Sequence, residues 1–350
     1  MKILRHFYGT KLKNLKLKNL KLQNLKVSYK LNILFFLILI FSFVIISYAA
    51  FKAISKTLFD QALQTTEQII SQTGEKVNLT FSEINKLTVL AKNNRQLVEI
   101  IDSYETLNLD EKSIADDQIS NILTSYFSNR DELADVYFVT NGRDYTLDRS
   151  YVGLSDGYSF TKDNIKFKWF TKTNEKSLWT ETYVSDYKNT YDISPYVITL
   201  FKKVNNYTVN QKDMGTLIVN IKESLIKELL KNVKFSYDKS HVFIIDKNGY
   251  LIEDPKNKEF LGKKLQYKYI KDILKTVKKD DFKMTSKKNY NVNDINSLLT
   301  YAKIDSTDWI IVGVVPMNSI TKIVYDTYFV VWIICSLVIV LGLFLSRIIT

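Results

Sequence analysis

The chain has 350 residues, of which 46% are hydrophobic and 25% are charged, a composition that excludes both wholesale disorder and a transporter with many membrane spans. Its single cysteine, Cys335, excludes an intramolecular disulfide framework and any multi-cysteine metal site. The formal net charge of +12 would suit a nucleic-acid-binding fold only if the basic residues were spread over that fold.

The basic residues are concentrated at the N-terminus. Residues 1–30 contain eight lysines, one arginine and no acidic residue, whereas residues 52–322 contain 39 basic and 36 acidic residues. The charge therefore belongs to a basic tail, and no nucleic-acid partner is expected. Within the tail, residues 11–25 repeat as KLKNL, KLKNL and KLQNL. This repeat is either a segment that lies on anionic membrane lipid or a repeat expansion of a tail that sets membrane topology.

Two uncharged apolar runs predict two transmembrane helices, at residues 31–51 and 327–346. About 20 helical residues cross a hydrocarbon core of ~30 Å. The first run could instead be a cleaved signal peptide, but it exceeds the ~7–15 residues usual for such a segment. Because segments rich in lysine and arginine next to a membrane span stay on the cytoplasmic side, we expect cytoplasmic N- and C-termini, with residues 52–326 on the outer side of the cell membrane.

A stalk helix is predicted to leave the membrane over residues 52–100. Its apolar positions recur every three or four residues, which gives the helix one apolar face. This face could form a dimer seam continuous with the first span, or it could pack on its own domain; the second alternative is favoured for the upper half. The apolar stripe comprises Ile54, Leu58, Ala62, Thr65 and Ile69, followed by Val77, Phe81, Ile84, Leu87 and Leu90.

The region beyond the stalk contains two similar strand-and-turn stretches, at residues 136–142 and 242–249, which begin 106 residues apart. This spacing suits two copies of a small α/β module, at residues 101–230 and 231–322. The further predicted strands are 196–204, 216–220, 298–304 and 309–315, and the predicted helices are 110–128, 221–230 and 270–278.

Four segments in this order resemble a known family. They are the segment with Trp169, Phe170, Trp179 and Tyr183, then residues 214–230, 241–255 and 307–320. Together they resemble the double Cache sensor domain of bacterial transmembrane receptors. The resemblance implies an α+β fold, in which two stacked PAS-like antiparallel-sheet modules sit on a long N-terminal helix flanked by two transmembrane helices.

The resemblance also implies a function. Residues 101–230 would form the membrane-distal module, which usually binds the ligand, and residues 231–322 the membrane-proximal one. The nearest relatives are expected among sensor histidine kinases paired with AraC-type response regulators, and residues 347–350 resemble the start of a HAMP linker. We therefore expect a homodimeric sensor that signals to a cytoplasmic partner or output domain. The alternatives are an anchored binding module that does not signal, or the sensor fragment of a chemotaxis-type receptor.

The amino-acid-binding members of this family carry an arginine two residues before the tryptophan, a Tyr-x-Asp pair and a late aspartate. Here those positions hold Phe167, Ser185 and Asn220. Without the arginine, no bidentate clamp for a carboxylate is expected. The sequence therefore favours a sugar-like or other neutral polar ligand over an amino acid. The predicted ligand-binding residues are Trp169, Tyr183, Asp186, Tyr196 and Asn220, each of which could alternatively serve only in packing.

No enzymatic activity is expected from these residues. The two histidines, His6 and His241, are too few for a catalytic relay or a metal site, and His241 at a strand start is expected to be structural. No carboxylate pair stands out among the many acids, so an exported hydrolase is the weakest alternative. We expect neither a cofactor nor a metal.

Overall fold

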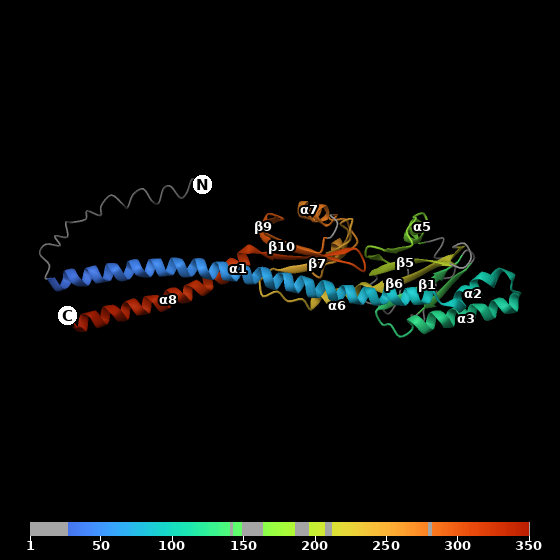
Figure 1. Cartoon of the computed structure of the whole chain (residues 1–350), viewed down its shortest axis with the longest axis horizontal. Helices are drawn as coiled ribbons and strands as arrows, with labels where there is room; N and C mark the ends of the chain where they lie inside the picture. The colour runs from blue at the N-terminus through green and yellow to red at the C-terminus, as the bar shows by residue number, and fades with distance from the viewer. Residues whose placement is uncertain are drawn as a thin grey trace. The chain divides into compact units, whose positions relative to one another are not determined.

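The computed structural model describes residues 27–140, 143–148, 164–185, 196–206, 212–278 and 282–349. The chain forms two compact units, one made by residues up to Phe59 together with those from Thr321 onward, and the other by Asp60–Ile320. Figure 1 shows the elements of both units along the chain. Asp186, one of the predicted ligand-binding residues, lies outside the described residues.

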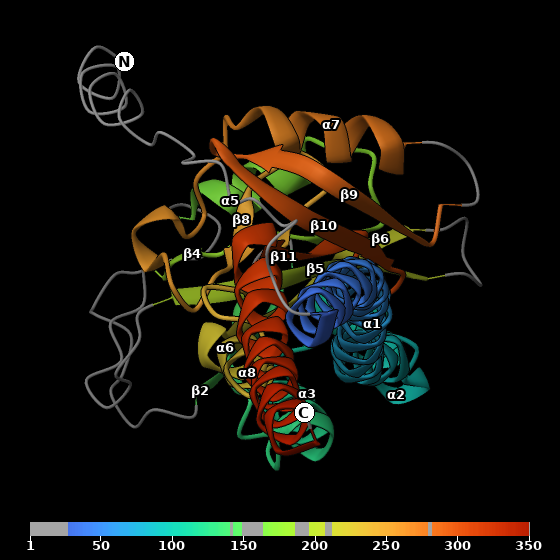
Figure 2. The same ribbon diagram turned by 90° about the vertical axis from the view of Figure 1, so that its left-hand side faces the viewer.

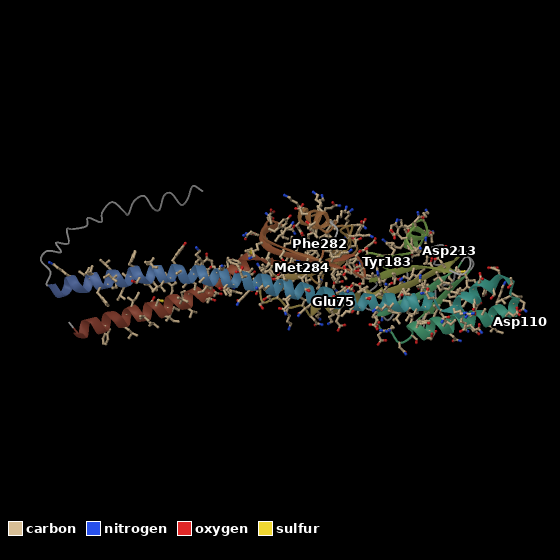
Figure 3. The ribbon with its side chains drawn as sticks, viewed as in Figure 1. Glu75, Asp110, Tyr183, Asp213, Phe282 and Met284 are labelled. Atoms are coloured by element: carbon tan, nitrogen blue, oxygen red, sulfur yellow. The ribbon has the colours of Figure 1, made fainter. Side chains whose placement is uncertain are left out.

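The first unit consists of the apolar ends of two long helices, α1 (Val27–Lys92) and α8 (Met317–Ile349). Both helices are long and apolar enough to cross a membrane. Their side chains are exposed apolar groups, tan along the sticks in Figure 3, whereas nitrogen and oxygen tips cover the second unit. Aromatic rings join the two helices, with ring centroids 4.9 Å apart for Phe43 and Trp332 and 5.0 Å apart for Phe51 and Tyr328. Two apolar helices therefore flank the folded body, as the sequence predicts.

The first module of the body is an antiparallel sheet in the order β2-β1-β6-β5-β3, with β4 paired to β5. Its strands are β1 (Leu133–Val139), β2 (Asp144–Asp148), β3 (Ser177–Trp179), β4 (Tyr183–Val184), β5 (Tyr196–Asn206) and β6 (Lys212–Lys222). Its helices are α2 (Arg95–Ser103), η2 (Tyr104–Thr106), α3 (Leu109–Phe127) and α5 (Ile165–Thr171), and α6 (Glu223–Lys231) leads to the second module.

The second module is an antiparallel sheet in the order β8-β7-β11-β10-β9. Its strands are β7 (His241–Ile245), β8 (Leu251–Glu253), β9 (Met284–Val292), β10 (Ile295–Ile304) and β11 (Trp309–Pro316), and its helices are η3 (Lys258–Phe260) and α7 (Lys268–Val277). As predicted, Pro316 ends the last strand, because proline cannot donate a further ladder hydrogen bond. The two similar sheets confirm the expected α+β fold.

Helix α1 packs on one face of each sheet, and a shorter helix covers the other face. In the second module, α7 lies on the face opposite α1, as the end-on view in Figure 2 shows. Tyr269, Ile270 and Ile273 of α7 belong to the buried cluster on this face. In the first module, Phe167 and Phe170 of α5 occupy the corresponding place. Because strand side chains alternate between faces, each strand contributes to both layers.

The extramembrane half of α1 is part of the core of both modules. Ile70, Val77, Phe81 and Ile84 belong to one buried cluster that includes residues of both sheets. The upper half of the predicted apolar stripe is therefore confirmed as domain packing at Val77, Phe81 and Ile84. Ile70 is not a predicted stripe position; the prediction placed Ile69 there, which is only partly buried. Two stripe positions are wrong, since Thr65 and Leu90 are exposed. The helical repeat buries Thr66 and Ala91 in their place, since 3.6 residues per turn shifts the buried face along a long helix.

The other predicted helices, 110–128, 221–230 and 270–278, correspond to α3, α6 and α7. Helix α6 begins two residues later than predicted, because Ile221 and Lys222 remain in β6 and pair with Ile198 and Val197. The sequence analysis did not predict α2, whose N-terminus is capped by the Asn94 side chain. It also missed the short or edge strands β2, β3, β4 and β9, whose apolar alternation is weak.

The two modules are in close contact at the start of β4. The Thr182 hydroxyl donates to the carbonyl of Ile252 at 2.5 Å. Gly262 has φ +68°, and a Cβ atom there would lie 2.0 Å from the Thr182 carbonyl oxygen, so only glycine fits.

A buried pair of glutamates lies at the same junction. Glu223 begins α6 and Glu253 ends β8, and both are buried. No hydrogen-bond donor among the described residues reaches either carboxyl oxygen of Glu253. Burial and the adjacent Glu223 carboxyl raise the pKa of Glu253 to about 9, although Lys227 nearby acts in the opposite direction.

We predict that this pair makes the folded chain less stable as the pH rises. The folded state keeps a proton on Glu253 up to about pH 9, whereas the unfolded chain loses it near a pKa of ~4.3, so between these values the folded state binds more protons. The free energy of unfolding should therefore fall with pH, by at most about 1.4 kcal/mol per pH unit for this proton.

Thermal unfolding of the full chain in lipid nanodiscs at several pH values measures this effect. Glu253→Gln should flatten the pH dependence, and Glu259→Gln, at an exposed position of η3, should leave it unchanged. Equal pH dependence in the wild type and Glu253→Gln would contradict the assignment.

Candidate functional site

A row of polar side chains crosses the α5-covered face of the first sheet. Cross-strand register places Asp135 of β1 beside Asn220 of β6, and Asn220 beside Thr199 of β5. All three are at least nine-tenths buried. The next row in the same register, Tyr137, Ile218 and Phe201, is apolar and packs with Phe167 and Phe170. The face thus has a polar end and an apolar end, the combination that small-molecule sites use to orient a ligand.

Hydrogen bonds connect the polar row in one direction. The Thr199 hydroxyl donates to Asn220 Oδ1 at 2.6 Å, so the Tyr183 hydroxyl, 2.6 Å from Thr199 Oγ1, donates to Thr199. The Thr199 backbone N–H donates to Thr180 Oγ1 at 2.9 Å. This direction fixes Asn220 Oδ1 as an acceptor, and the Asn220 side-chain amide keeps its donors for another group, since none of the described residues accepts from them.

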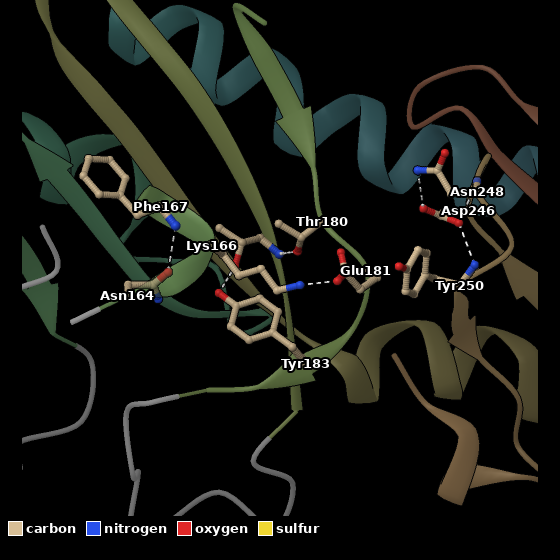
Figure 4. Close-up of polar contacts among 10 residues, drawn as sticks. Asn164, Lys166, Phe167, Thr180, Glu181, Tyr183, Asp246, Asn248 and Tyr250 are labelled. Atoms are coloured by element: carbon tan, nitrogen blue, oxygen red, sulfur yellow. Dashed lines mark hydrogen bonds and ion pairs between the residues drawn. The ribbon is translucent and has the colours of Figure 1, made fainter. Parts of the chain in front are cut away.

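Lys166 adds a positive charge beside this network. It lies on α5, whose first turn is capped by the Asn164 side chain, which accepts from the Phe167 N–H at 2.9 Å. The ammonium of Lys166 pairs with Glu181 and lies 5.7 Å from the centroid of the Tyr183 ring. Figure 4 shows Lys166 between Tyr183 and Glu181. The site therefore contains a carboxyl group (Asp135), an amide donor (Asn220) and an ammonium group (Lys166). This set suits a ligand that carries one positive and one negative charge.

The structure brings together two of the sequence-predicted site residues, Tyr183 and Asn220, through Thr199. Trp169 is 54% exposed and lines a different cleft, because α5 turns Phe167 and Phe170 inward instead. Tyr196 packs against the core of the second module.

Sequence reasoning missed Asp135, Thr199 and Lys166. One signal was present for Asp135, a lone acid in the apolar strand LADVYFV. The described residues contain no group of three or more His, Cys, Asp or Glu that could hold a metal ion.

The sequence profile of the Cache domain matches residues 54–323. This match confirms the predicted sensor domain. A comparison with curated protein sequences gives no match.

Solved structures of sensor domains share the fold. The ligand-binding domain of the Campylobacter jejuni chemoreceptor Tlp3, in complex with 4-methylisoleucine, is 17% identical with a TM-score of 0.52, over 76% of this chain and 94% of that one. The periplasmic sensory domain of the Campylobacter jejuni chemoreceptor Tlp1 is 14% identical, with a TM-score of 0.58, and the match covers 76% of this chain and 98% of that one. The extracellular domain of the putative histidine kinase mmHK1S-Z3 is 14% identical, with a TM-score of 0.51, and the match covers 77% of this chain and 98% of that one.

The predicted preference for a sugar-like ligand over an amino acid is wrong by these comparisons. Tlp3 is described with 4-methylisoleucine, and the ligand-binding domain of Mlp24 with asparagine. The prediction assumed that a missing arginine at Phe167 leaves no charged group for a carboxylate. In the structure Phe167 is buried in the apolar row, and the neighbouring Lys166 carries a positive charge beside Tyr183.

We predict that Asn220 stabilises the polar row more than Tyr183 does. Asn220→Ala removes the acceptor of a buried hydroxyl and should lower the free energy of unfolding by about 1–3 kcal/mol. Tyr183→Phe leaves the Thr199–Asn220 bond intact and should cost about 0.5–1.5 kcal/mol. Chemical denaturation of the full chain in nanodiscs compares the two variants. A Tyr183→Phe cost equal to or above that of Asn220→Ala would contradict the direction of the network.

Proposed function

Because the chain belongs to the Cache domain family, we propose that it is the sensor part of a two-pass membrane receptor that binds an amino acid at the polar row of its first module. The observation that carries the ligand class is the placement of Asp135 and Asn220 side by side on β1 and β6. A carboxylate at this position suits an α-ammonium group, and the Asn220 amide donors suit a carboxylate. The apolar row of Tyr137, Ile218 and Phe201 would receive the side chain of the ligand.

The membrane arrangement is part of the same proposal. The first module is membrane-distal and the second membrane-proximal, residues 52–326 face the outside, and both termini are cytoplasmic. The lysine-rich tail before the first apolar helix supports this orientation. The output is a histidine kinase paired with an AraC-type regulator, a choice that rests on the resemblance of the sequence. The similarity to a putative histidine kinase agrees with the kinase part of this choice alone.

Ligand binding would act by population shift. A ligand that prefers one arrangement of β5 and β6 stabilises that arrangement in proportion to its differential affinity. Strand β5 carries Thr199 on the ligand side and Lys202 on the α1 side, where the Lys202 ammonium donates to Asn85 of α1. A shift of β5 at the polar row would therefore reach α1 directly, through the Lys202–Asn85 contact.

A thermal-shift screen of the full chain in nanodiscs tests the ligand class. We expect at least one of the twenty common L-amino acids to raise the midpoint of unfolding, and glucose, ribose and succinate to have no effect. Binding should stabilise by mass action, so a concentration about 100-fold above the Kd adds ~2.7 kcal/mol.

Two variants localise the effect. Asp135→Asn removes the charge proposed to meet the ammonium and should weaken amino-acid binding about tenfold or more. Asp213→Asn, at an exposed position on the same sheet, is the matched control and should bind like the wild type. Stabilisation by a sugar alone would contradict the proposal, and so would an Asp135→Asn variant that binds as tightly as the control.

A further inference from the structure

A second cleft, with a volume of about 320 Å³, lies between the two modules of the body. Its walls come from β3 of the first module, from Asn85 of α1, and from the second-module loops at residues 246–248 and 305–308. Lys202 in its lining belongs to the α1 face of β5, whereas Thr199 of the polar row belongs to the opposite face. The cleft and the polar row are neighbours, because Thr180 and Glu181 of the lining contact Thr199 and Lys166.

Lys202 is a charged side chain that is only 6% exposed in this cleft. An ammonium group has three N–H donors, yet the only acceptor that the described residues offer it is Asn85 Oδ1. No carboxylate among these residues lies within salt-bridge distance of Lys202, and the charge of Lys92 on α1 is nearby. Burial and Lys92 lower the pKa of Lys202 to about 8. The cleft thus contains a buried cation that has no ion-pair partner among the described residues.

Five of the described acidic residues line the cleft, and three of them, Glu181, Asp246 and Asp308, already have partners. Glu181 pairs with Lys166, and Asp308 pairs with Lys303 at 2.8 Å. Asp246 accepts hydrogen bonds from its own turn, from the backbone N–H groups of Asn248 and Tyr250 at 2.9 and 2.7 Å. It also accepts from the Asn248 side-chain amide at 3.2 Å, and Figure 4 shows this contact and the one with Tyr250. These acids therefore do not form an ion pair with Lys202. Their negative charges repel anions, which restricts the cleft to ligands of small negative charge.

The remaining lining favours a ligand with a small apolar part. Trp169, Trp179 and Trp309 contribute to the walls, and the Ser306 hydroxyl in the lining is buried with no hydrogen-bond partner among the described residues. A carboxylate accepts hydrogen bonds from an ammonium and from a hydroxyl, and a methyl or short alkyl group fits beside indole rings.

We propose that this cleft is a second ligand site, which binds a small monocarboxylate through the Lys202 ammonium with the alkyl end of the ligand against the tryptophan rings. The occupant would contact both modules and α1 at once. Binding here would provide the receptor with a second chemical input.

Acetate is the probe that tests this site. The full chain in nanodiscs is titrated by replacing chloride with acetate at constant sodium concentration, and the tryptophan emission is recorded, because Trp169, Trp179 and Trp309 line the cleft. We expect a saturable change in emission. Lys202→Met should weaken the apparent affinity about tenfold or more, whereas Lys176→Met, an exposed lysine next to β3, should leave it unchanged.

A second variant keeps the test decisive if Lys202→Met does not fold, which circular dichroism would show. Asn85→Asp places a permanent carboxylate on Lys202 and should exclude acetate, with an affinity loss of about tenfold or more. Asp135→Asn should leave the acetate response intact, which separates this site from the first one. A response that does not saturate, a response that persists in Asn85→Asp, or no change when acetate replaces chloride would overturn the proposal.

Discussion

Three aromatic rings, those of Phe81, Trp179 and Trp309, hold the body of the protein together. They come from α1, from the first module and from the second module, and their centroids lie 4.8 to 6.0 Å apart in edge-to-face pairs. The Trp179 indole N–H also donates to the carbonyl of Ser306 in the second module at 3.1 Å. Because one buried cluster includes all three elements, neither sheet completes its core without α1.

This shared helix explains how the fold can serve a sensor. Both the polar row and the cleft next to Lys202 involve β5, and Lys202 connects β5 directly to Asn85 of α1. The same helix continues into an apolar segment long enough to span a membrane. A packed core does not deform continuously, so a small shift at β5 would move α1 as a unit. The buried Glu223–Glu253 pair, next to the Thr182–Ile252 contact, is predicted to make the stability of the module junction depend on pH.

Much of the fold could be predicted from the sequence because its signals are local. The two apolar runs, the periodic stalk and the duplicated strand-and-turn pattern each depend on residues close together in the chain. Leu90 and Thr65 were placed wrongly because a straight helix drifts relative to any repeat read from spacing alone. Edge strands such as β9 were missed because one face is exposed, which removes the apolar alternation.

The site was harder to predict because its residues meet through tertiary pairing. Asp135 and Asn220 are far apart in sequence, and only the β1–β6 register brings them together. Trp169 was assigned to the distal pocket from its type, but the helical phase of α5 points Phe167 and Phe170 to the sheet and leaves Trp169 at the other cleft. The ligand class was misjudged for a related reason, since the absence of one arginine says nothing about a lysine that the fold supplies nearby.

The central claim is that α1 joins the two modules into one cooperative body through Phe81. Hydrogen-exchange mass spectrometry of the full chain in nanodiscs tests it by comparing the wild type with Phe81→Ala, which should cost about 3–5 kcal/mol, and with Leu79→Ala, at a position on the same helix that is 61% exposed. The account predicts that Phe81→Ala speeds exchange in β1 and β6 and in β7 and β11 together, and that Leu79→Ala changes neither pair. Faster exchange confined to one module would contradict it.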